Sequence, residues 1–343
     1  MKLAIIGTTI NGESGYLPFD RLAAESEFSD VSFVVAGDTN SKPFDTSGFK
    51  CRIEYLEPKD QERFAVSETI GWKTPRRRPA AWLRAIELEP DYILSIDDDN
   101  IPPDDYFATW HRVLTTPVGR VAAAKTGVSE PQWYNYLASS DAPIEIYPRG
   151  FPLAFRTRTA VEITAAPEAI KPAAIGLWQG ISLGDPDIDA MTRLVWPART
   201  PLASIGEKNY CLRDIWSPYN MQNTAYAPSL FGLPILWPHA GRFDDIYASF
   251  VFQKFLFNTS RYAYVGDPIN RQDRGVRDTL RLDFPEEVEG YAVGHEVWRV
   301  ISEISETDPV RFLERIASAI HPAIERERAF FRAYLKDLAA VLP

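Results

Sequence analysis

Short apolar segments alternate with helix-like segments over about the first 125 residues, and this alternation is the feature that most limits the possible folds. The predicted strands are residues 3–9, 31–38, 51–56 and 92–96, and the predicted helix is 79–88. Pro79 falls in the first turn of that helix, where its missing N–H group is tolerated. Strands that alternate with helices form largely parallel sheets, which bind ligands beyond the carboxyl ends of their strands. We therefore expect a site in the loops that follow Gly7, Ala36 and Ile96.

The rest of the chain changes character twice. Residues 126–285 are rich in Pro, Trp and Tyr and show little periodicity, which predicts a second, mixed half of the same domain that supplies long loops. From residue 286 to the end, apolar residues recur at helical spacing, and Pro309 and Pro322 divide this tail into separate helices. The sequence thus predicts an α/β domain in two halves, 1–125 and 126–285, with a helical extension, 286–343.

Charge and cysteine content limit the partners and the compartment. The 343-residue chain has 37 basic and 47 acidic residues and a net charge of −10, which argues against non-specific binding to nucleic acid or anionic membranes. Cys51 and Cys211 stand far apart without metal-ligand spacing, so a reducing compartment is expected. No segment approaches the roughly 20 apolar residues of a membrane span, and the apolar run at the N-terminus is too short for a signal peptide. We expect a cytoplasmic protein.

Three consecutive carboxylates, Asp97, Asp98 and Asp99, follow the predicted strand 92–96. Like charges this close repel one another, and keeping them ionised requires a cation or full solvation. Asp97 and Asp99 offer the hard oxygen ligands that Mg²⁺ and Mn²⁺ bind together with substrate phosphates. The alternative is a solvated acidic turn that caps the next helix. The apolar strand before the triplet and a basic cluster upstream favour the metal site.

That basic cluster is Arg76, Arg77 and Arg78, directly before the predicted helix 79–88. Guanidinium groups at a helix N-terminus suit a pyrophosphate, because they add donors to the free backbone N–H groups. The alternative is a solvated run of charge. With the acidic triplet about twenty residues downstream, a metal-and-arginine clamp on a diphosphate is predicted, to which Asp98 would contribute.

The loops after the first two predicted strands carry Thr8, Asn11 and Asp38. Short polar groups in such loops hydrogen-bond the base and ribose of a nucleoside, although Asn and Asp also simply favour turns. Together with the arginine helix and the acidic strand end, these loops describe a site for a nucleotide-diphospho-sugar. They correspond to the N-terminal half of the GT-A glycosyltransferase architecture.

The chain also resembles the reversibly glycosylated polypeptides, the UDP-arabinopyranose mutases. The resemblance depends on "YPRGFPLAFR" (147–156), "GLWQGISLGDPDIDAMTRLVWP" (176–197) and "GRFDDIYASFVFQ" (241–253), with weaker matches at 8–11 and 37–42. It implies a GT-A fold, a UDP-sugar ligand and a divalent cation, Mn²⁺ or Mg²⁺. Residues 1–125 would be the nucleotide-sugar-binding half, and 126–285 would form the sugar and acceptor side.

The family's functional residues carry over onto matching positions of this chain. Asp97 and Asp99 would hold the metal and diphosphate, and Asp38 would contact the nucleoside. Arg149 matches the arginine that takes the sugar reversibly, and Arg156 matches a second arginine that the activity needs. The residues expected to line the sugar side of the cleft are Asp187, Asp189, Asp244 and Asp245.

A covalent adduct on Arg149 would hold the sugar while its ring opens and recloses, which divides one difficult step into two. Arginine is a poor nucleophile because its pKa stays above about 12 in proteins. It would need a carboxylate to take its proton, and Asp245 or Asp187 could serve. The alternative is that Arg149 only neutralises the departing diphosphate.

Some positions depart from the family pattern. The family has a histidine before its C-terminal helices, a plausible metal ligand, whereas the stretch 266–278 here has Arg271 and no histidine. His239 is the nearest replacement ligand, although a lone histidine is more often structural. Trp178 could stack on a sugar or be buried. The stretch 220–238 also differs, which leaves the sugar open.

The leading prediction is interconversion of the pyranose and furanose forms of UDP-arabinose or a similar UDP-sugar. The first alternative is a metal-dependent GT-A glycosyltransferase with Asp245 as general base. The second is a non-catalytic UDP-sugar-binding subunit that assembles through the helical tail. The aromatic residues of that tail could form a homo-oligomer interface or could cover the domain; they are Trp298, Phe312, Phe330 and Phe331.

Overall fold

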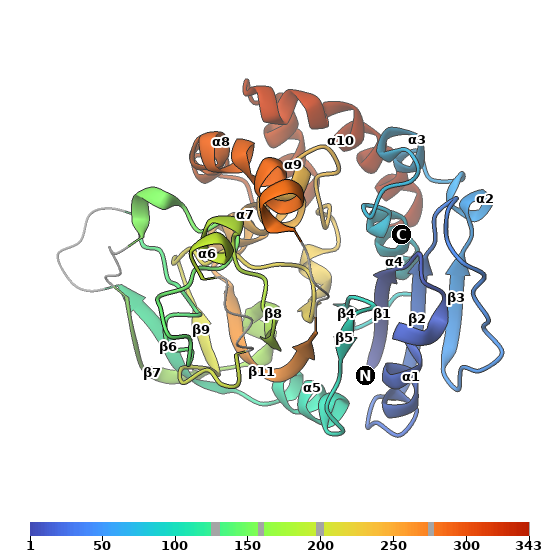
Figure 1. Ribbon diagram of the computed structural model, residues 1–343, viewed down its shortest axis with the longest axis horizontal. Helices are drawn as coiled ribbons and strands as arrows, with labels where there is room; N and C mark the ends of the chain where they lie inside the picture. The colour runs from blue at the N-terminus through green and yellow to red at the C-terminus, as the bar shows by residue number, and fades with distance from the viewer. Residues whose placement is uncertain (125–130, 157–160, 197–201, 274–277, 343) are drawn as a thin grey trace.

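The computed structural model describes residues 1–124, 131–156, 161–196, 202–273 and 278–342, and a mixed sheet runs through both halves of the chain (Figure 1). Its strands are β1 (Lys2–Thr8), β2 (Asp30–Ala36), β3 (Arg52–Leu56), β4 (Tyr92–Ser95), β5 (Asn100–Ile101), β6 (Val118–Ala124), β7 (Val161–Ile170), β8 (Ile175–Gly184), β9 (Tyr210–Leu212), β10 (Thr224–Tyr226) and β11 (Tyr262–Gln272). The strand order is β3-β2-β1-β4-β10-β8-β11-β9-β6-β7, and β5 pairs with β11.

The first half of the sheet is parallel, as the alternation of strands and helices predicts. β1 runs parallel to both β2 and β4, and β2 runs parallel to β3. β10 is antiparallel to both β4 and β8, and it joins the two halves of the sheet. The carboxyl ends of β1, β2 and β4 therefore lie at one edge of the sheet, where the polar loops were expected.

Helices cover both faces of this sheet. They are α1 (Leu17–Ala23), α2 (Pro58–Gln61), α3 (Val66–Ile70), α4 (Arg78–Ile86), α5 (Tyr106–Thr115), α6 (Ala190–Val195), α7 (Asp244–Asn258), α8 (Phe284–Ser302), α9 (Pro309–Ser318) and α10 (Pro322–Val341). Pro79 lies in the first turn of α4, and Pro309 and Pro322 begin α9 and α10, which confirms the predicted breaks in the tail. No helix of the described residues is both long and apolar enough to cross a membrane.

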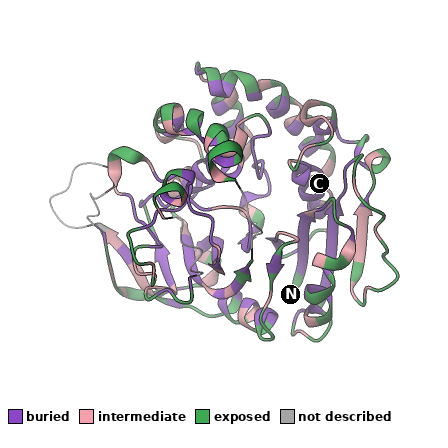
Figure 2. Ribbon diagram, in the orientation of Figure 1, coloured by how far each residue is buried: buried purple, intermediate pink, exposed green. Residues whose placement is uncertain are grey.

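Central strands such as β1 and β2 are buried on both faces, and two apolar cores lie on the two sides of the sheet. Leu3 and Ile5 of β1 belong to the core beneath α1 and α5, whereas Ala4 and Ile6 belong to the core beneath α4, α7 and the C-terminal helices. This division follows the two-residue repeat of a strand. Figure 2 shows the buried strands between helices whose outer faces are exposed. The predicted class, an α/β sheet flanked by helices with a helical extension at the C-terminus, is confirmed.

The tail packs back onto the domain. All four predicted aromatic residues of the tail are buried; Trp298 lies 5.3 Å from Trp133 between ring centres, and Phe331 lies 5.0 Å from Trp237. The indole Nε1 of Trp82 in α4 donates to the hydroxyl of Tyr334 in α10 at 3.0 Å. These side chains therefore cover the domain, and a homo-oligomer through other parts of the tail stays a prediction. The predicted boundary at 125–126 lies outside the described residues, and the one at 285–286 falls in the first turn of α8.

Candidate functional site

A cleft of about 820 Å³ lies at the carboxyl edge of β1, β2 and β4, and both halves of the chain line it. It brings together these predicted residues: Thr8, Asn11, Asp38, Arg76, Arg77, Arg78, Asp97, Asp98, Asp99, Arg149, Asp187, Asp244 and Asp245. Polar residues from segments far apart in the sequence therefore meet at the predicted edge.

The three carboxylates of the acidic triplet have different partners. Asp97 accepts a hydrogen bond from Nη2 of Arg78 at 2.6 Å, and its side chain is 32% exposed. Asp98 accepts from Oγ1 of Thr9 at 2.7 Å, which ties the loop after β4 to the loop after β1. Both oxygens of Asp99 accept from Nε2 of Gln272, at 3.0 and 2.9 Å. Each carboxylate thus has a hydrogen-bonded neighbour that reduces the repulsion within the triplet.

Arg77 and Arg78 line the cleft, and their guanidinium groups are bonded to protein partners; their contact with a diphosphate stays a prediction. The buried Arg77 guanidinium donates to Gln61, to Ser67 and to the carbonyl of Gly71, and it lies 3.8 Å from the ring of Trp72. Burial lowers the pKa of Arg77 to about 10. Arg78 is equally buried, and it orients Asp97. Both side chains are enclosed because the start of α4 packs directly on the sheet.

Arg76 remains at the surface of the cleft, between two acidic side chains. Its Nε donates to Asp244 at 3.0 Å, and its Nη2 lies 3.7 Å from Glu286 of α8. Its guanidinium group therefore interacts with one carboxylate of the second half and one of the helical extension.

Asp38 shapes the loop that leads to Arg76. Its carboxylate accepts from the backbone N–H groups of Lys73 and Thr74 at 2.8 and 3.0 Å, and from Thr39. Burial alone would raise the pKa of Asp38, but these hydrogen bonds lower it below its ordinary value. Its direct contact with a nucleoside stays a prediction, as do those of Thr8 and Asn11.

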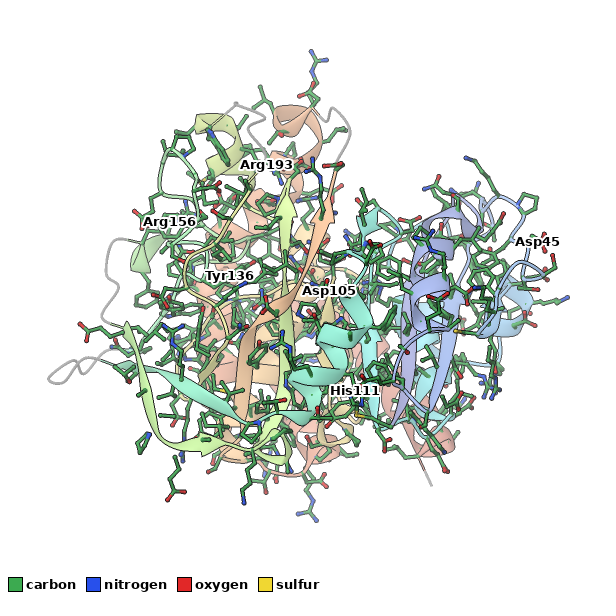
Figure 3. All side chains as sticks on the ribbon, turned by 90° about the horizontal axis from the view of Figure 1, so that it is seen from below. Asp45, Asp105, His111, Tyr136, Arg156 and Arg193 are labelled. Carbon is green, nitrogen blue, oxygen red and sulfur yellow. The ribbon has the colours of Figure 1, made fainter. Side chains whose placement is uncertain are left out.

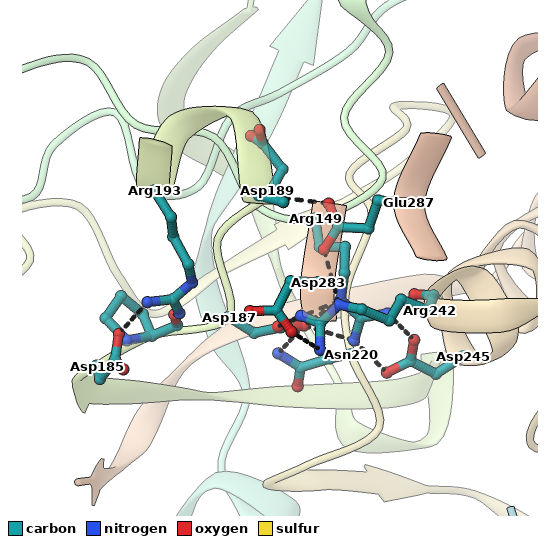
Figure 4. Close-up of polar contacts among 12 residues, drawn as sticks. Arg149, Asp185, Asp187, Asp189, Arg193, Asn220, Arg242, Asp245, Asp283 and Glu287 are labelled. Atoms are coloured by element: carbon teal, nitrogen blue, oxygen red, sulfur yellow. Dashed lines mark hydrogen bonds and ion pairs between the residues drawn. The ribbon is translucent and has the colours of Figure 1, made fainter. Parts of the chain in front are cut away.

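Arg149 is the centre of the second half of the cleft (Figure 4). Its Nε and Nη2 donate to Asp187 at 3.0 and 2.7 Å, and its Nη1 and Nη2 donate to Asp245 at 2.8 and 3.1 Å. Nη1 also donates to the carbonyl of Arg242. A guanidinium has five N–H donors. In Arg149, Nε has one acceptor and Nη1 and Nη2 have two each, so all five donors are bonded to protein acceptors.

Burial and charge shift the pKa of both partners in this pair. Burial alone would lower the pKa of Arg149, but Asp187 and Asp245 raise it well above its ordinary value. Burial raises the pKa of Asp245 to about 7; Arg149 opposes this shift, and the nearby carboxylates of Asp244 and Asp187 add to it. Asp245 is therefore a stronger base than an exposed aspartate, and its proton acceptor atoms face Arg149.

Arg242 and its partners belong to the site, although they were not predicted. Its Nε donates to Glu287 at 2.8 Å, its Nη1 lies 3.2 Å from Asp283, and its Nη2 lies 3.8 Å from Asp187. Arg242 stands directly before Phe243 in the matched segment 241–253, which is the signal that could have identified it. Nothing in the sequence marks Glu287, because its role depends on where α8 docks.

Further residues that were not predicted also line the cleft. Asn220 donates to Asp187 at 3.3 Å, and the backbone N–H of Met221 donates to Asp245 at 3.4 Å. Other residues of the lining are Lys73, Gln222, Gln272, Asp273 and Glu286. These side chains reach the cleft only through the tertiary fold.

Arg156 and Asp189 lie outside the lining of the cleft and contact each other. Nη2 of Arg156 donates to Asp189 at 2.7 Å, and its guanidinium lies 4.5 Å from the ring of Tyr147. Asp189 is fully buried and caps α6 by accepting from the N–H of Thr192 at 2.8 Å. Figure 3 places Arg156 in the half of the molecule away from β1 to β3. The pair supports the segment that carries Arg149, which corrects the prediction that Asp189 lines the cleft.

Two further predictions are wrong. Trp178 is fully buried in the apolar core and packs edge-on against Tyr92, 5.3 Å between ring centres, so it does not stack on a ligand in the cleft. His239 does not join Asp97 and Asp99: its Nδ1 lies 3.0 Å from Glu327 of α10, and its Nε2 lies 3.1 Å from the carbonyl oxygen of Thr69. The hydrogen bond with Glu327 raises the pKa of His239.

The acidic triplet fits a hard divalent cation. No cluster of three or more His, Cys, Asp or Glu residues in the described part of the chain is arranged to hold a metal by itself. Mg²⁺ and Mn²⁺ do not require one, because one or two carboxylates together with substrate phosphates and water suffice. Asp97 and Asp99 supply those carboxylates in the cleft, and the neighbouring side chains offer further oxygens. The donor set therefore suits Mg²⁺ or Mn²⁺.

The chain matches no protein-family model and no curated protein. Among solved structures it is similar to glucosyl-3-phosphoglycerate synthase from Mycobacterium tuberculosis in complex with Mn²⁺, UDP and phosphoglyceric acid, with 12% identity and a TM-score of 0.43 over 85% of this chain and 78% of that one. It is also similar to the mannosyltransferase PcManGT from Pyrobaculum calidifontis in complex with GDP-Man and Mn²⁺, with 11% identity and a TM-score of 0.35 over 99% and 72%. A third is TarS 1-349 from S. aureus, with 10% identity and a TM-score of 0.33 over 99% and 91%. At identities and TM-scores this low, the likeness assigns neither a family nor an activity to this chain.

Proposed function

We propose that this chain is a nucleotide-sugar enzyme of the GT-A type that binds a UDP-sugar and a divalent cation in the cleft. The support is the meeting of an acidic strand end, polar loops and a buried arginine–carboxylate cluster in one cavity of about 820 Å³, within the size range of small-ligand sites. Asp97 and Asp99 would hold Mg²⁺ or Mn²⁺, which when bound supplies positive charge against the diphosphate. The ammonium group of Lys73, exposed at the rim, has no ion-pair partner among the described residues and would add a cation for the phosphates.

The activity that we propose is the interconversion of the pyranose and furanose forms of the sugar, with Arg149 as the nucleophile. The observation that carries it is the position of Asp245, which is 5% exposed and has both carboxylate oxygens bonded to Arg149. A base that is buried in this way reaches the protons of Arg149 before those of a separate acceptor. The geometry therefore favours Asp245 as the base for Arg149 over Asp245 as the base for a transferred sugar's acceptor.

The proposed reaction balances as follows. A guanidinium nitrogen of Arg149 forms a bond to C1, the bond between C1 and the diphosphate oxygen breaks, and UDP leaves with the electron pair. Asp245 takes the N–H proton as this bond forms. The bond between C1 and the ring oxygen then breaks as the lone pair of the attached nitrogen forms a C=N bond, which opens the ring. The oxygen of another hydroxyl group of the sugar bonds to C1, the C=N pair returns to the nitrogen, and the proton of that hydroxyl passes to the former ring oxygen, which closes the ring of the other size. UDP displaces the nitrogen, and Asp245 returns the proton.

Arg156 acts in this proposal as a positioning residue. Its contacts with Asp189 and with the ring of Tyr147 hold the chain two residues before Arg149. Loss of Arg156 would therefore move the nucleophile without removing a group that touches the sugar.

The test is incubation with UDP-arabinopyranose and Mg²⁺ or Mn²⁺, with NMR of the nucleotide-sugar and mass spectrometry of the digested protein. We expect a furanose product and a pentose on the peptide that contains Arg149, and both should vanish in Arg149→Lys. Arg193→Lys is the matched control, because Arg193 pairs with Asp185 outside the cleft lining.

Two results would redirect the proposal. Release of UDP only when an acceptor is added would assign transfer to that acceptor, and UDP binding without turnover would leave a binding subunit. Furanose formation that survives in Arg149→Lys would refute the role of this arginine.

A further inference from the structure

Gln272, the last residue of β11, pairs with Asn100 of β5 and so lies next to the acidic triplet. It is 1% exposed, lines the cleft, and its Nε2 lies 3.0 and 2.9 Å from the two oxygens of Asp99. Asp99 also receives a longer contact of 3.5 Å from Nδ2 of Asn100. The side-chain N–H groups of Gln272 and Asn100 thus point at the carboxylate of Asp99. A cation would be attracted to the same carboxylate.

The surrounding amides have fixed orientations that leave one buried donor unused. Oδ1 of Asn100 accepts from the backbone N–H of Asp97 at 3.2 Å, so its Nδ2 must face Oε1 of Gln222, at 3.5 Å. This leaves Nε2 of Gln222, in a side chain that is 3% exposed, without an acceptor in the described part of the chain. A buried donor without a partner in the lining of the cleft indicates that a further group with a hydrogen-bond acceptor completes this end of the cleft.

An amide side chain can exchange its two roles by rotation about its last torsion, which has two nearly equivalent orientations. In Gln272 this rotation puts Oε1 where Nε2 now lies, beside both oxygens of Asp99, without movement of the backbone. The side chain can therefore donate to Asp99 when no cation is present and offer an oxygen when one is bound.

We propose that Gln272 is a protein ligand of the divalent cation, through its amide oxygen, together with Asp97 and Asp99. This inference rests on the proposed function, which places a divalent cation in the cleft. It adds a third ligand and favours a cation that binds oxygen. A donor set of two carboxylates and one amide contains only oxygen, which suits Mg²⁺ and Mn²⁺ and disfavours Zn²⁺, whose sites are built from His and Cys.

The test is a titration of the protein with Mn²⁺, alone and with saturating UDP, followed by the electron paramagnetic resonance signal of free Mn²⁺, with Zn²⁺ as competitor. Gln272→Ala should weaken Mn²⁺ binding by about tenfold or more. Gln272→His should raise the ratio of Zn²⁺ to Mn²⁺ affinity by about tenfold or more, because an imidazole nitrogen replaces an oxygen. Arg271→Ala is the matched control, since Arg271 is the preceding residue on β11 and pairs at the surface with Asp273.

Melting curves recorded with EDTA establish that each variant is folded. If Gln272→Ala is unstable, Gln272→Glu serves as a second variant. Gln272→Glu should bind Mn²⁺ more tightly than the wild type. Equal Mn²⁺ affinity in the wild type and the folded variants, or no Mn²⁺ binding by the wild type with UDP present, would overturn the inference. These readouts need no turnover. Sugar interconversion with unchanged cation binding in the variants would therefore reject only this inference, and altered cation binding without interconversion would reject only the proposed activity.

Discussion

Asp245→Asn removes one ionisable group from the centre of the site while it keeps the size of the side chain. Burial moves the pKa of Asp245 from 3.8 to about 7 in the folded protein. Between these two values the folded state holds a proton that the unfolded state has released, so the free energy of unfolding of the wild type falls as the pH rises. The contribution is fully present below about pH 4 and is lost as the pH rises through about 7. Three pKa units correspond to roughly 4 kcal/mol.

The variant lacks this dependence, so the comparison isolates it. From about pH 5 to about pH 8, the wild type should lose roughly 3 kcal/mol relative to Asp245→Asn. Urea denaturation of both proteins at the two pH values measures the difference directly. In the proposed reaction, kcat/KM of the wild type should also rise with pH through about 7, and the variant should lose this rise together with roughly 100-fold in rate.

The reasoning fails if the two proteins lose stability in parallel over this range. Such a result would mean that Asp245 does not carry a proton at neutral pH in the folded protein. Its pKa would then not be raised, Asp245 would be a weaker base than the proposal requires, and the choice of Asp245 as the base for Arg149 would lose its support even if the enzyme were active.

Three other predictions concern residues whose roles the structure changes. Asp38→Asn should cost stability at neutral pH and progressively less in acid, because hydrogen bonds lower the pKa of Asp38 and its contribution is lost as the pH falls through that value; urea denaturation at about pH 3 and about pH 7 checks this. Trp178→Ala should destabilise the protein by about 4 kcal/mol as a core cavity, while calorimetry should find UDP binding by the folded variant unchanged. His239→Gln should cost stability below about pH 6.5 and less as the pH rises past the raised pKa that Glu327 gives His239, with Mn²⁺ affinity unchanged in the titration described above.

The sequence predicts the first half of the fold and site well, because there the informative residues are close together in the chain. The runs 3–6 and 92–96 are almost entirely apolar, as strands covered on both faces must be. Polar loops at the ends of parallel strands then have to share one edge of the sheet. Arg78 and Asp97 stand 19 positions apart and form an ion pair. Arginines at the start of a helix, followed closely by aspartates at the end of a strand, therefore identified two groups that meet in the cleft.

The second half could not be predicted in this way, for physical reasons. The helix α7 carries apolar residues around its whole circumference, with Phe250, Val251 and Phe252 all buried, so it has no polar face to reveal its period. The contact of Gln272 with Asp99 spans 173 positions. The family resemblance marks the stretch 266–278 as the place of a plausible metal ligand, but nothing in the sequence singles out Gln272 within it.

Arg149 and Asp245 limit each other's chemistry. All five N–H donors of Arg149 have protein acceptors, so no nitrogen can bond to a sugar carbon, and no donor can reach a phosphate, until one of these contacts is broken. Protonation turns a carboxylate oxygen from an acceptor into a donor, and burial raises the pKa of Asp245, which contacts this guanidinium, to about 7. Transfer of the proton from Arg149 to Asp245 therefore frees the nitrogen and loosens the carboxylate's hold in one event. For this reason the titration of Asp245, more than the presence of Arg149, decides whether the site is a reactive pair or only a buried ion pair.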